Sequence, residues 1–505
     1  MPIVIAGFSS TDKVPGAYGE VKFGAGAISA ASIPLVLLLV GLKTTAGSAN
    51  SDTEVKSIFS QDDATSYFGA GSQLERMCRK AIKYQGVQIK AIAVAEAGGS
   101  IAATASITIS GSWIATGTWT YRVAGETFTG TVGTTDTATQ VAAAIRDAFN
   151  ANAGSPVTAA SAAGVVTLTT KNKGTSQNRH VLFQDRSLLP TGASSAIAGG
   201  AAVTGDGVLF SGGTGTENVT NALATINPTR YDRIAIGQLD AANLTLWRTQ
   251  LNAQAEVLTG ILQHAVCASN DTLTAATSLA QTSLNAQRFQ LCWHLSSETH
   301  PSEIAASMAG LRVQAEQSDP DAHFDGAILK GVSPQSQRTD WPIHATLVSA
   351  LNNGVTPITT TPDGFATVVR SIVTHSLTGA NPDYSTLDTG DAVVPDFVLA
   401  ALKLYWVSQI VPNNPRVADD SSIDERRKPS GIITPSTWNA AVYGILKDFE
   451  AGRTGGVQIA PIIINVEQNL PVSQFDPAAK RIMTALTVIP APSNHQVGIS
   501  VRQAA

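Results

Sequence analysis

The chain has 505 residues, of which 33 are Lys or Arg and 38 are Asp or Glu, so its formal net charge is −5. This balance excludes the strongly basic footprint of a nucleic-acid-binding protein. Charged residues make up 14 % of the chain, against about 25 % in an average globular protein, which favours a subunit whose surface is largely covered by other subunits. The length predicts three or four domains of roughly 100–200 residues each.

The cysteines and the most apolar run exclude two further classes of protein. Cys78, Cys267 and Cys292 are too few and too scattered for a disulfide framework, and they suit a reducing cytosol. The apolar run Ile33–Leu42 has ten residues and is interrupted by a proline and a glycine, whereas a membrane span needs about 20. We therefore expect a buried strand there and no membrane insertion.

Residues 1–23 are predicted to form an N-terminal arm. Two extended segments, Pro2–Phe8 and Ala17–Phe23, are separated by a turn-rich stretch. An isolated pair of strands is marginally stable in water, so the arm must dock on a sheet of its own subunit or of a neighbour. The apolar side chains expected to make inter-subunit contacts are those of Ile3, Val4, Ile5, Tyr18 and Val21.

Strands alternate with helices in residues 24–98 and again in 206–341. This alternation predicts an α/β core with a doubly wound parallel sheet. The expected strands are Ile33–Val40, Ile89–Ala95, Arg233–Gly237, Gln263–Ala268 and Phe289–Leu295, and the expected helices are Ser72–Tyr84, Asn243–Leu258, Leu273–Asn285 and Ser302–Gln317.

Residues 99–205 change in composition to Thr, Gly and β-branched residues, with one amphipathic helix at Ala138–Asn150. Stretches rich in Gly and Ala stand on both sides of this block. The pattern predicts a β-rich α+β domain that is inserted into the core and faces outward. Its strands are expected at Ser106–Ser110, Thr118–Val123, Glu126–Val132 and Val165–Thr170.

Residues 342–484 are predicted to form a C-terminal α+β assembly domain, followed by a C-terminal arm at 485–505. The expected elements are helices at Ile343–Leu351, Val393–Val411 and Pro435–Glu450, a strand region at Thr356–Thr374, and terminal strands within Val457–Glu467 and Met483–Val501. In the arm, Val497, Ile499 and Val501 recur with a period of two and share one face of a strand, while Arg502 lies on the other. These four residues are candidate contacts with a neighbouring subunit.

Four segments carry candidate chemistry. Gly213–Asn218 resembles the start of a dinucleotide-binding fingerprint, but the third glycine is missing and Glu217 would repel a pyrophosphate. A glycine-rich hinge before a helix is the favoured reading. Asp319–Gly326 resembles the opening of a calcium loop, but His323 and Val332 occupy two ligand positions, so a solvated turn before a strand at Ala327–Gly331 is favoured.

The histidines and cysteines of two neighbouring strands have the side chains of a zinc site, namely His264, Cys267, Cys292 and His294. Residues three apart on a strand face opposite sides, so His264 and Cys267 cannot share one metal without a bulge. We expect all four to be structural and free of metal.

A charge cluster lies between the last two predicted helices. The simpler interpretation is a solvated loop with internal ion pairs. The more specific hypothesis is an electrostatic contact between subunits. The residues concerned are Asp424, Glu425, Arg426, Arg427 and Lys428. The commonest hydrolase, zincin and phosphate-loop motifs do not occur in the sequence, so we expect neither an enzyme nor a cofactor.

Four segments in this order resemble the sheath protein of a contractile phage tail of the Mu-like type: Val14–Tyr18, Pro34–Gly41, Asn221–Gly237 and Val488–Arg502. The resemblance implies a virion structural protein that is assembled in the host cytoplasm. It further implies hexameric rings stacked around an inner tube, whose contraction drives the tube through the host cell envelope. The implied partners are further copies of the chain, the inner tail tube protein, and the baseplate and tail terminator proteins.

The resemblance also implies that terminal arms of neighbouring subunits join one shared sheet. Three alternatives stay open. The chain could be the sheath subunit of a phage-derived bacteriocin or injection machine, an α/β enzyme with a ligand site near Gly213–Asn218, or a secreted adhesin that carries the Thr- and Gly-rich insertion.

Overall fold

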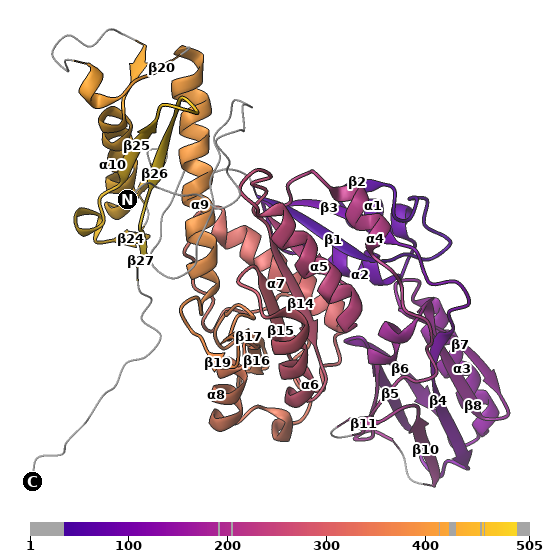
Figure 1. Ribbon diagram of the computed structural model, residues 1–505. Coiled ribbons are helices and arrows are strands. Elements are labelled where there is room, and N and C mark those ends of the chain that lie inside the picture. Colours follow the sequence, from indigo (N-terminus) through magenta and orange to yellow (C-terminus); the bar gives the residue numbers. More distant parts are fainter. Residues whose placement is uncertain are drawn as a thin grey trace, which may run out of the picture.

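The computed structural model describes residues 35–189, 192–203, 206–413, 415–423, 431–454, 457–458 and 460–491. The described chain is elongated, with the core in the middle, residues 102–209 at one end and residues 431–491 at the other (Figure 1). The expectation of a multidomain chain with α/β and α+β regions is confirmed. The two extended segments predicted at residues 2–8 and 17–23 lie outside the described residues, and so does the part of the predicted 483–501 strand region that follows residue 491.

The core is built on an eight-stranded sheet with the strand order β17-β16-β15-β14-β13-β1-β3-β2. The strands from β16 to β3 pair in parallel, and β17 and β2 are antiparallel at the two edges. The strands are β1 (Val36–Leu42), β2 (Val55–Ile58), β3 (Gln88–Val94), β13 (Arg233–Ile236), β14 (His264–Ser269), β15 (Phe289–Trp293), β16 (Thr356–Thr360) and β17 (Ala366–Val368). Strands buried on both faces have nearly continuous apolar runs, as β1 does.

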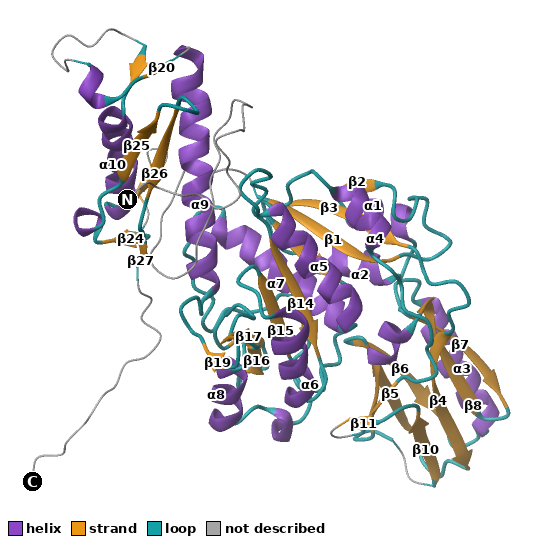
Figure 2. Ribbon diagram, in the orientation of Figure 1, coloured by secondary structure: helices purple, strands orange, loops and turns teal. Residues whose placement is uncertain are grey.

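Helices cover both faces of this sheet (Figure 2). Successive residues of β1 face opposite ways: Leu37 and Leu39 lie in the core cluster of α2 and α7, whereas Leu38 and Val40 lie in that of α4, α5 and α6. The helices are α1 (Gln61–Phe68), α2 (Gln73–Ala81), α4 (Thr220–Ile226), α5 (Ala241–Gln254), α6 (Leu273–Ser278) and α7 (Pro301–Glu316). The single helix expected at Leu273–Asn285 is α6 followed by a π-helical turn, Leu279–Leu284.

The insertion has its own hydrophobic core between two sheets and α3 (Ala138–Ala151). Phe128 and Phe149 stack there with ring centroids 4.0 Å apart. Where the chain enters and leaves, Ile101 and Thr214 form an antiparallel bridge. The strands are β4 (Ala102–Gly111), β5 (Gly117–Val123), β6 (Glu126–Val132), β7 (Val157–Ala162), β8 (Val165–Lys173), β9 (Val181–Asp185), β10 (Ala193–Ala198), β11 (Ala202–Val203) and β12 (Gly207–Leu209).

The C-terminal region packs two long helices against short strands. Val394 and Val398 of α9 contact a cluster that includes Val442 and Leu446 of α10. The helices are α8 (His344–Asn352), α9 (Thr389–Tyr405) and α10 (Pro435–Glu450). The strands are β18 (Leu377–Thr378), β19 (Asn381–Pro382), β20 (Arg416–Val417), β21 (Ile432–Ile433), β22 (Arg453–Thr454), β23 (Val457–Gln458), β24 (Ile463–Ile464), β25 (Val472–Asp476), β26 (Arg481–Ala485) and β27 (Ile489–Pro490).

Candidate functional site

The predicted inter-subunit residues of both arms and of the charge cluster lie outside the described residues. Their roles therefore stay predictions. What the structure describes is the surface of the C-terminal region and the contacts that hold the three parts of the subunit together.

The C-terminal region contains two-stranded sheets among its described residues, of which β25–β26 is the longest. This hairpin lies beside α10, where the indole Nε1 of Trp438 donates a hydrogen bond to Thr484 Oγ1 at 2.8 Å. Ser473 Oγ donates to Asn439 Oδ1 at 2.6 Å. Because a two-stranded sheet is marginally stable by itself, it depends on such packing or on further strands.

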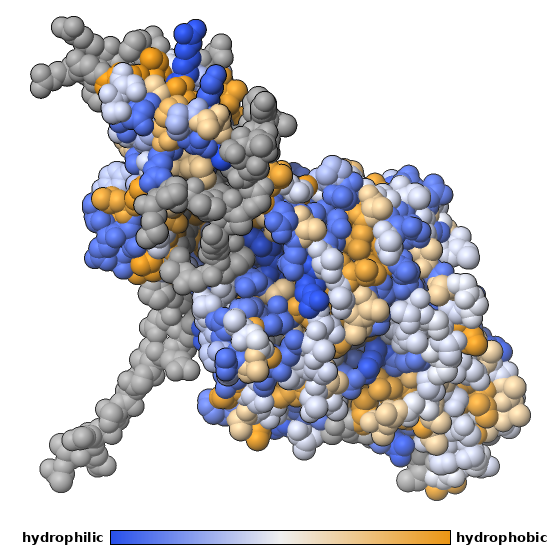
Figure 3. Space-filling model, viewed as in Figure 1, coloured by the Kyte–Doolittle hydropathy of each residue, from blue (hydrophilic) through white to orange (hydrophobic). Residues whose placement is uncertain are grey.

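Helix α9 continues through a π-helical turn, Trp406–Ile410, and presents apolar side chains to the surface. Leu404, Val407 and Val411 are exposed. The span Thr389–Asn413 is long and apolar enough to cross a membrane, and 28 % of its most apolar window is buried in the molecule. Length and composition alone are weak evidence for a membrane span. Apolar residues also occur in small groups elsewhere on the C-terminal region and on the insertion (Figure 3).

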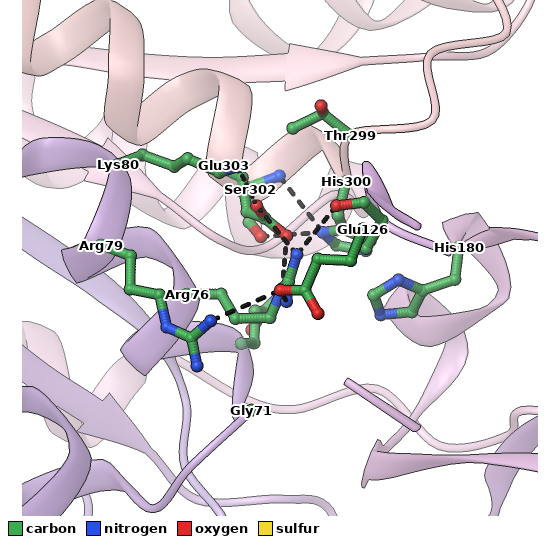
Figure 4. A network of polar contacts seen from close by, with 12 residues as sticks. Gly71, Arg76, Arg79, Lys80, Glu126, His180, Thr299, His300, Ser302 and Glu303 are labelled. Carbon is green, nitrogen blue, oxygen red and sulfur yellow. Dashed lines mark hydrogen bonds and ion pairs between the residues drawn. The ribbon is translucent and has the colours of Figure 1, made fainter. Parts of the chain in front are cut away.

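A buried polar network joins the core to the insertion (Figure 4). Arg76 of α2 donates from Nε to Glu303 of α7 at 2.7 Å and from Nη1 to Glu126 of β6 at 2.5 Å. It also donates to the carbonyls of Ala124 and Gly154. Lys80 forms an ion pair with Glu303 at 3.0 Å. We call this set of contacts the core–insertion network.

The residues of the core–insertion network stabilise one another in their charged forms. Burial by itself would raise the pKa of Glu303, but the charges of Arg76 and Lys80 lower it well below its usual range. Burial likewise opposes the charge on Arg76, but Glu303 and Glu126 raise its pKa. Paired charges of this kind resist separation, because either one alone would be buried without compensation.

Two imidazoles lie at the same seam. The rings of His180 and His300 have centroids 4.5 Å apart, and His300 Nε2 lies 3.1 Å from the carbonyl oxygen of Ser176. Burial lowers the pKa of His300 to about 4 and lowers that of His180 well below its usual value. Both rings are therefore neutral near pH 7.

A second buried ionic cluster joins α9 to the central sheet. Asp396 of α9 accepts two hydrogen bonds from Arg288, at 2.9 and 2.6 Å, and its Oδ2 lies 2.9 Å from His264 Nε2. Arg233 and Arg312 share Glu316 nearby. Burial opposes the charge on Asp396, yet Arg288 and His264 lower its pKa well below the usual range. We call these contacts the α9–core cluster.

The loop considered as a nucleotide site is occupied by the protein itself. The amide of Gly213 donates to Asn178 Oδ1 at 2.8 Å, and the amide of Thr214 donates to the Ile101 carbonyl at 3.2 Å. Glu217 is buried, and its burial raises its pKa to about 7. Two amides that a phosphate would need are thus already donating within the chain.

The candidate zinc ligands do not converge. Cys267 packs with α4, α5 and α6, whereas Cys292 packs with α2 and α7 on the opposite face of the sheet. His264 bonds to Asp396, and His294 is fully buried. Among the described residues no group of three or more His, Cys, Asp or Glu could hold a metal ion.

The Asp319–Gly326 segment differs from the solvated turn that we expected, because Asp321 is buried. Burial, followed by the charges of Asp319, Asp391 and Asp388, raises the pKa of Asp321 to about 8. The strand expected at Ala327–Gly331 is reduced to a bridge between Ile328 and Thr367. No local pattern predicts this burial, because Gly390 at the start of α9, 69 positions away in the sequence, lies against the Asp321 carboxyl group.

Comparison with known proteins supplies the remaining observations. No family model matches the chain. Over 143 residues it is 30 % identical to the Mu-like prophage FluMu tail sheath protein of Haemophilus influenzae; the match covers 28 % of this chain and 29 % of that relative. Its counterpart is therefore matched over less than a third of its length.

The comparison with solved structures finds weaker similarities. A sheath tail protein from Desulfitobacterium hafniense is 12 % identical, with 91 % of this chain and 97 % of that chain covered and a TM-score of 0.46. The helical sheath of the anti-feeding prophage in the contracted state is 11 % identical, with 98 % and 100 % covered and a TM-score of 0.48. The sequence match is the stronger finding: this chain is similar to the tail sheath protein of a Mu-like prophage, which confirms the resemblance inferred from its sequence.

Proposed function

We propose that this chain is the structural subunit of a contractile tail sheath. Its copies stack as hexameric rings around an inner tube, and contraction drives the tube through the host cell envelope. The sequence similarity to a Mu-like prophage tail sheath protein supports this class. The particle is a virion tail assembled in the host cytoplasm, and its other partners are the tube, baseplate and tail terminator proteins.

The observation that carries the proposal is the two-stranded β25–β26 sheet in the C-terminal region. Terminal arms of neighbouring copies extend this sheet by strand addition. Ile3, Val4, Ile5, Tyr18 and Val21 belong to one arm, and Val497, Ile499, Val501 and Arg502 belong to the other. Each main-chain hydrogen bond contributes about 0.5–1.5 kcal/mol net, so a strand with four or five bonds would contribute a few kcal/mol.

The charged segment from Asp424 to Lys428 adds an electrostatic contact between copies in the same proposal. Inside each copy, a doubly wound core carries an outward-facing insertion and an assembly domain. The core–insertion network and the α9–core cluster hold these parts in place while the lattice rearranges. No nucleotide is needed, because the extended lattice is a metastable packing and the contracted lattice has the lower free energy.

A structural role agrees with the Gly213–Asn218 loop, whose Gly213 and Thr214 amides are already bonded within the chain. We therefore propose neither catalysis nor a cofactor at this loop. An injection machine or bacteriocin would use the same subunit, and the neighbouring genes would distinguish such a particle from a virion.

Negative-stain microscopy of the purified chain tests the proposal. We expect hollow tubes or ring stacks of the contracted type to form without added nucleotide or metal. A chain that stays monomeric by light scattering at high concentration, while unfolding cooperatively, would contradict the proposal.

A further inference from the structure

A cleft of about 500 Å³ opens beside the core–insertion network. Its charged lining is unbalanced, with four cationic side chains against two carboxylates. The cations are Arg76, Arg79, Lys80 and Lys83, and the carboxylates are Glu126 and Glu303. Since a concave surface with low-dielectric walls focuses the field of its charges, the cleft attracts anions.

The donors of this cleft differ in how far they are already used. Arg76 is committed to two carboxylates and two carbonyls. Lys80 bonds to the Gly331 carbonyl at 2.7 Å and to Glu303, which leaves one N–H. Arg79 uses Nε for Glu75 and Nη1 for Glu126, which leaves Nη2. The backbone of Lys83 bonds to Lys80 and Lys330, but its ammonium makes no hydrogen bond or ion pair with any residue that the structure describes, so the three N–H groups of Nζ are available.

Lys83 is also held close to the backbone of the cleft. Gly331 has a φ of +76°, and a Cβ placed there would lie 2.5 Å from Lys83 Nζ. A larger residue would therefore displace the ammonium. Burial, together with the nearby charge of Lys80, lowers the pKa of Lys83. An incoming anion would offset both effects, because its opposite charge stabilises the ammonium.

We propose that this cleft binds a multiply charged oxyanion of the phosphate class, held by Lys83 with the spare donors of Lys80 and Arg79. Charge-assisted N–H···O bonds from three side chains suit the several oxygens of such an anion. Because Lys80 and Lys83 belong to the core and Glu126 to the insertion, the bound anion lies at their seam.

Equilibrium dialysis of the full chain against radiolabelled phosphate or pyrophosphate measures this binding, whether the chain is free or assembled. Chloride at the same ionic strength is the reference buffer. The test variant is Lys83→Gln, and the matched control is Lys173→Gln, at another exposed lysine. Loss of one charge-assisted bond should weaken binding by about tenfold or more in Lys83→Gln, with no change in Lys173→Gln.

Thermal unfolding gives a second readout. Pyrophosphate should raise the melting temperature of the native chain and of Lys173→Gln, because a ligand that binds the folded state stabilises it. It should have little effect on Lys83→Gln. The proposal is overturned if neither anion binds, or if Lys83→Gln binds as tightly as the native chain. Tube formation is scored separately, so failure of this site leaves the sheath function untouched.

Discussion

Two buried carboxylates show how neighbouring charges decide protonation. Glu303 has Arg76 and Lys80 within ion-pair distance, and these charges lower its pKa. Asp321 is also buried, but the charges that act on it are those of other aspartates, and its pKa rises to about 8. The pKa values of these two buried carboxyl groups are therefore shifted in opposite directions, because their neighbours carry opposite charges.

Asp321→Asn should make the protein more stable at alkaline pH. The folded-state pKa of Asp321 lies above its ordinary value of 3.8, so the folded chain binds this proton more tightly than the unfolded chain. The contribution of Asp321 to the free energy of unfolding is therefore fully present below pH 3.8 and is lost as the pH rises to about 8. At pH 9 we expect the variant to exceed the native chain by about 2 kcal/mol or more, measured by urea unfolding.

The control for this substitution is Asp363→Asn, at an exposed turn. It should leave the unfolding free energy nearly unchanged at both pH 5 and pH 9. A stability difference for Asp321→Asn that is the same at both pH values would contradict the assigned protonation.

Glu303→Gln should destabilise the subunit by about 3–5 kcal/mol, since it leaves Arg76 buried with less compensating charge. Urea unfolding at pH 7 measures the loss, with Glu256→Gln on an exposed position as the control. Adding Arg76→Met to Glu303→Gln should recover part of the stability, because the unpaired charge is then removed. A loss below about 1 kcal/mol in the single variant would show that water replaces the ion pair.

At the scale of elements, the sequence predicts helices whose capping residues and apolar periodicity are close together in the chain. The expected helix Ala138–Asn150 is observed as Ala138–Ala151, and its capping box, Thr137 with Gln140, lies within four residues of sequence. The π-helical turns Leu279–Leu284 and Trp406–Ile410 were not predicted, because segments of six and five residues are too short to change the apolar periodicity of the helices that they continue. Helix α1 was missed as well, since it is only eight residues long.

The seams between parts could not be predicted from the sequence. Arg76 and Glu303 are 227 positions apart, and no spacing rule connects them. Asp396 lies within the helix predicted at Val393–Val411, whereas its partners Arg288 and His264 belong to the core. Contacts of this kind depend on how elements pack in space, which a single sequence does not encode in any local pattern.

Truncation after Pro492 should leave the subunit folded but abolish tubes. The cut spares the β24–β27 pair and the bond from the Ala491 amide to the Ile462 carbonyl, while it removes the predicted strand that contains Val497, Ile499 and Val501. Circular dichroism checks folding and microscopy checks assembly. Tubes formed by the truncated chain would show that the arm plays no part in assembly.

At the scale of the whole molecule, the insertion is attached by more than its two connections. Arg122 of β5 pairs with Glu298 at 2.9 Å, and Arg179 pairs with Asp271 at 2.5 Å. Together with the core–insertion network, these contacts hold the insertion against the end of the core (Figure 1).

Replacing residues 102–213 by a short Gly/Ser linker should preserve tube formation, because Ile101 and Thr214 are already bridged and a linker can join them. The melting temperature should fall, since Arg76 loses Glu126 and two carbonyl acceptors. Microscopy and calorimetry measure the two outcomes. A cooperatively folded core that no longer forms tubes would show that the insertion belongs to the assembly surface.

The bidentate ion pair between Arg288 and Asp396 has a mechanical consequence. If terminal arms tie each copy to its neighbours at the C-terminal region, any pull on them reaches the core through α9. A planar guanidinium held by two parallel bonds, at 2.9 and 2.6 Å, opposes both sliding and twisting of that helix. The joint is therefore stiff, and in a lattice that contracts as proposed it would let the released work move whole copies rather than bend each one.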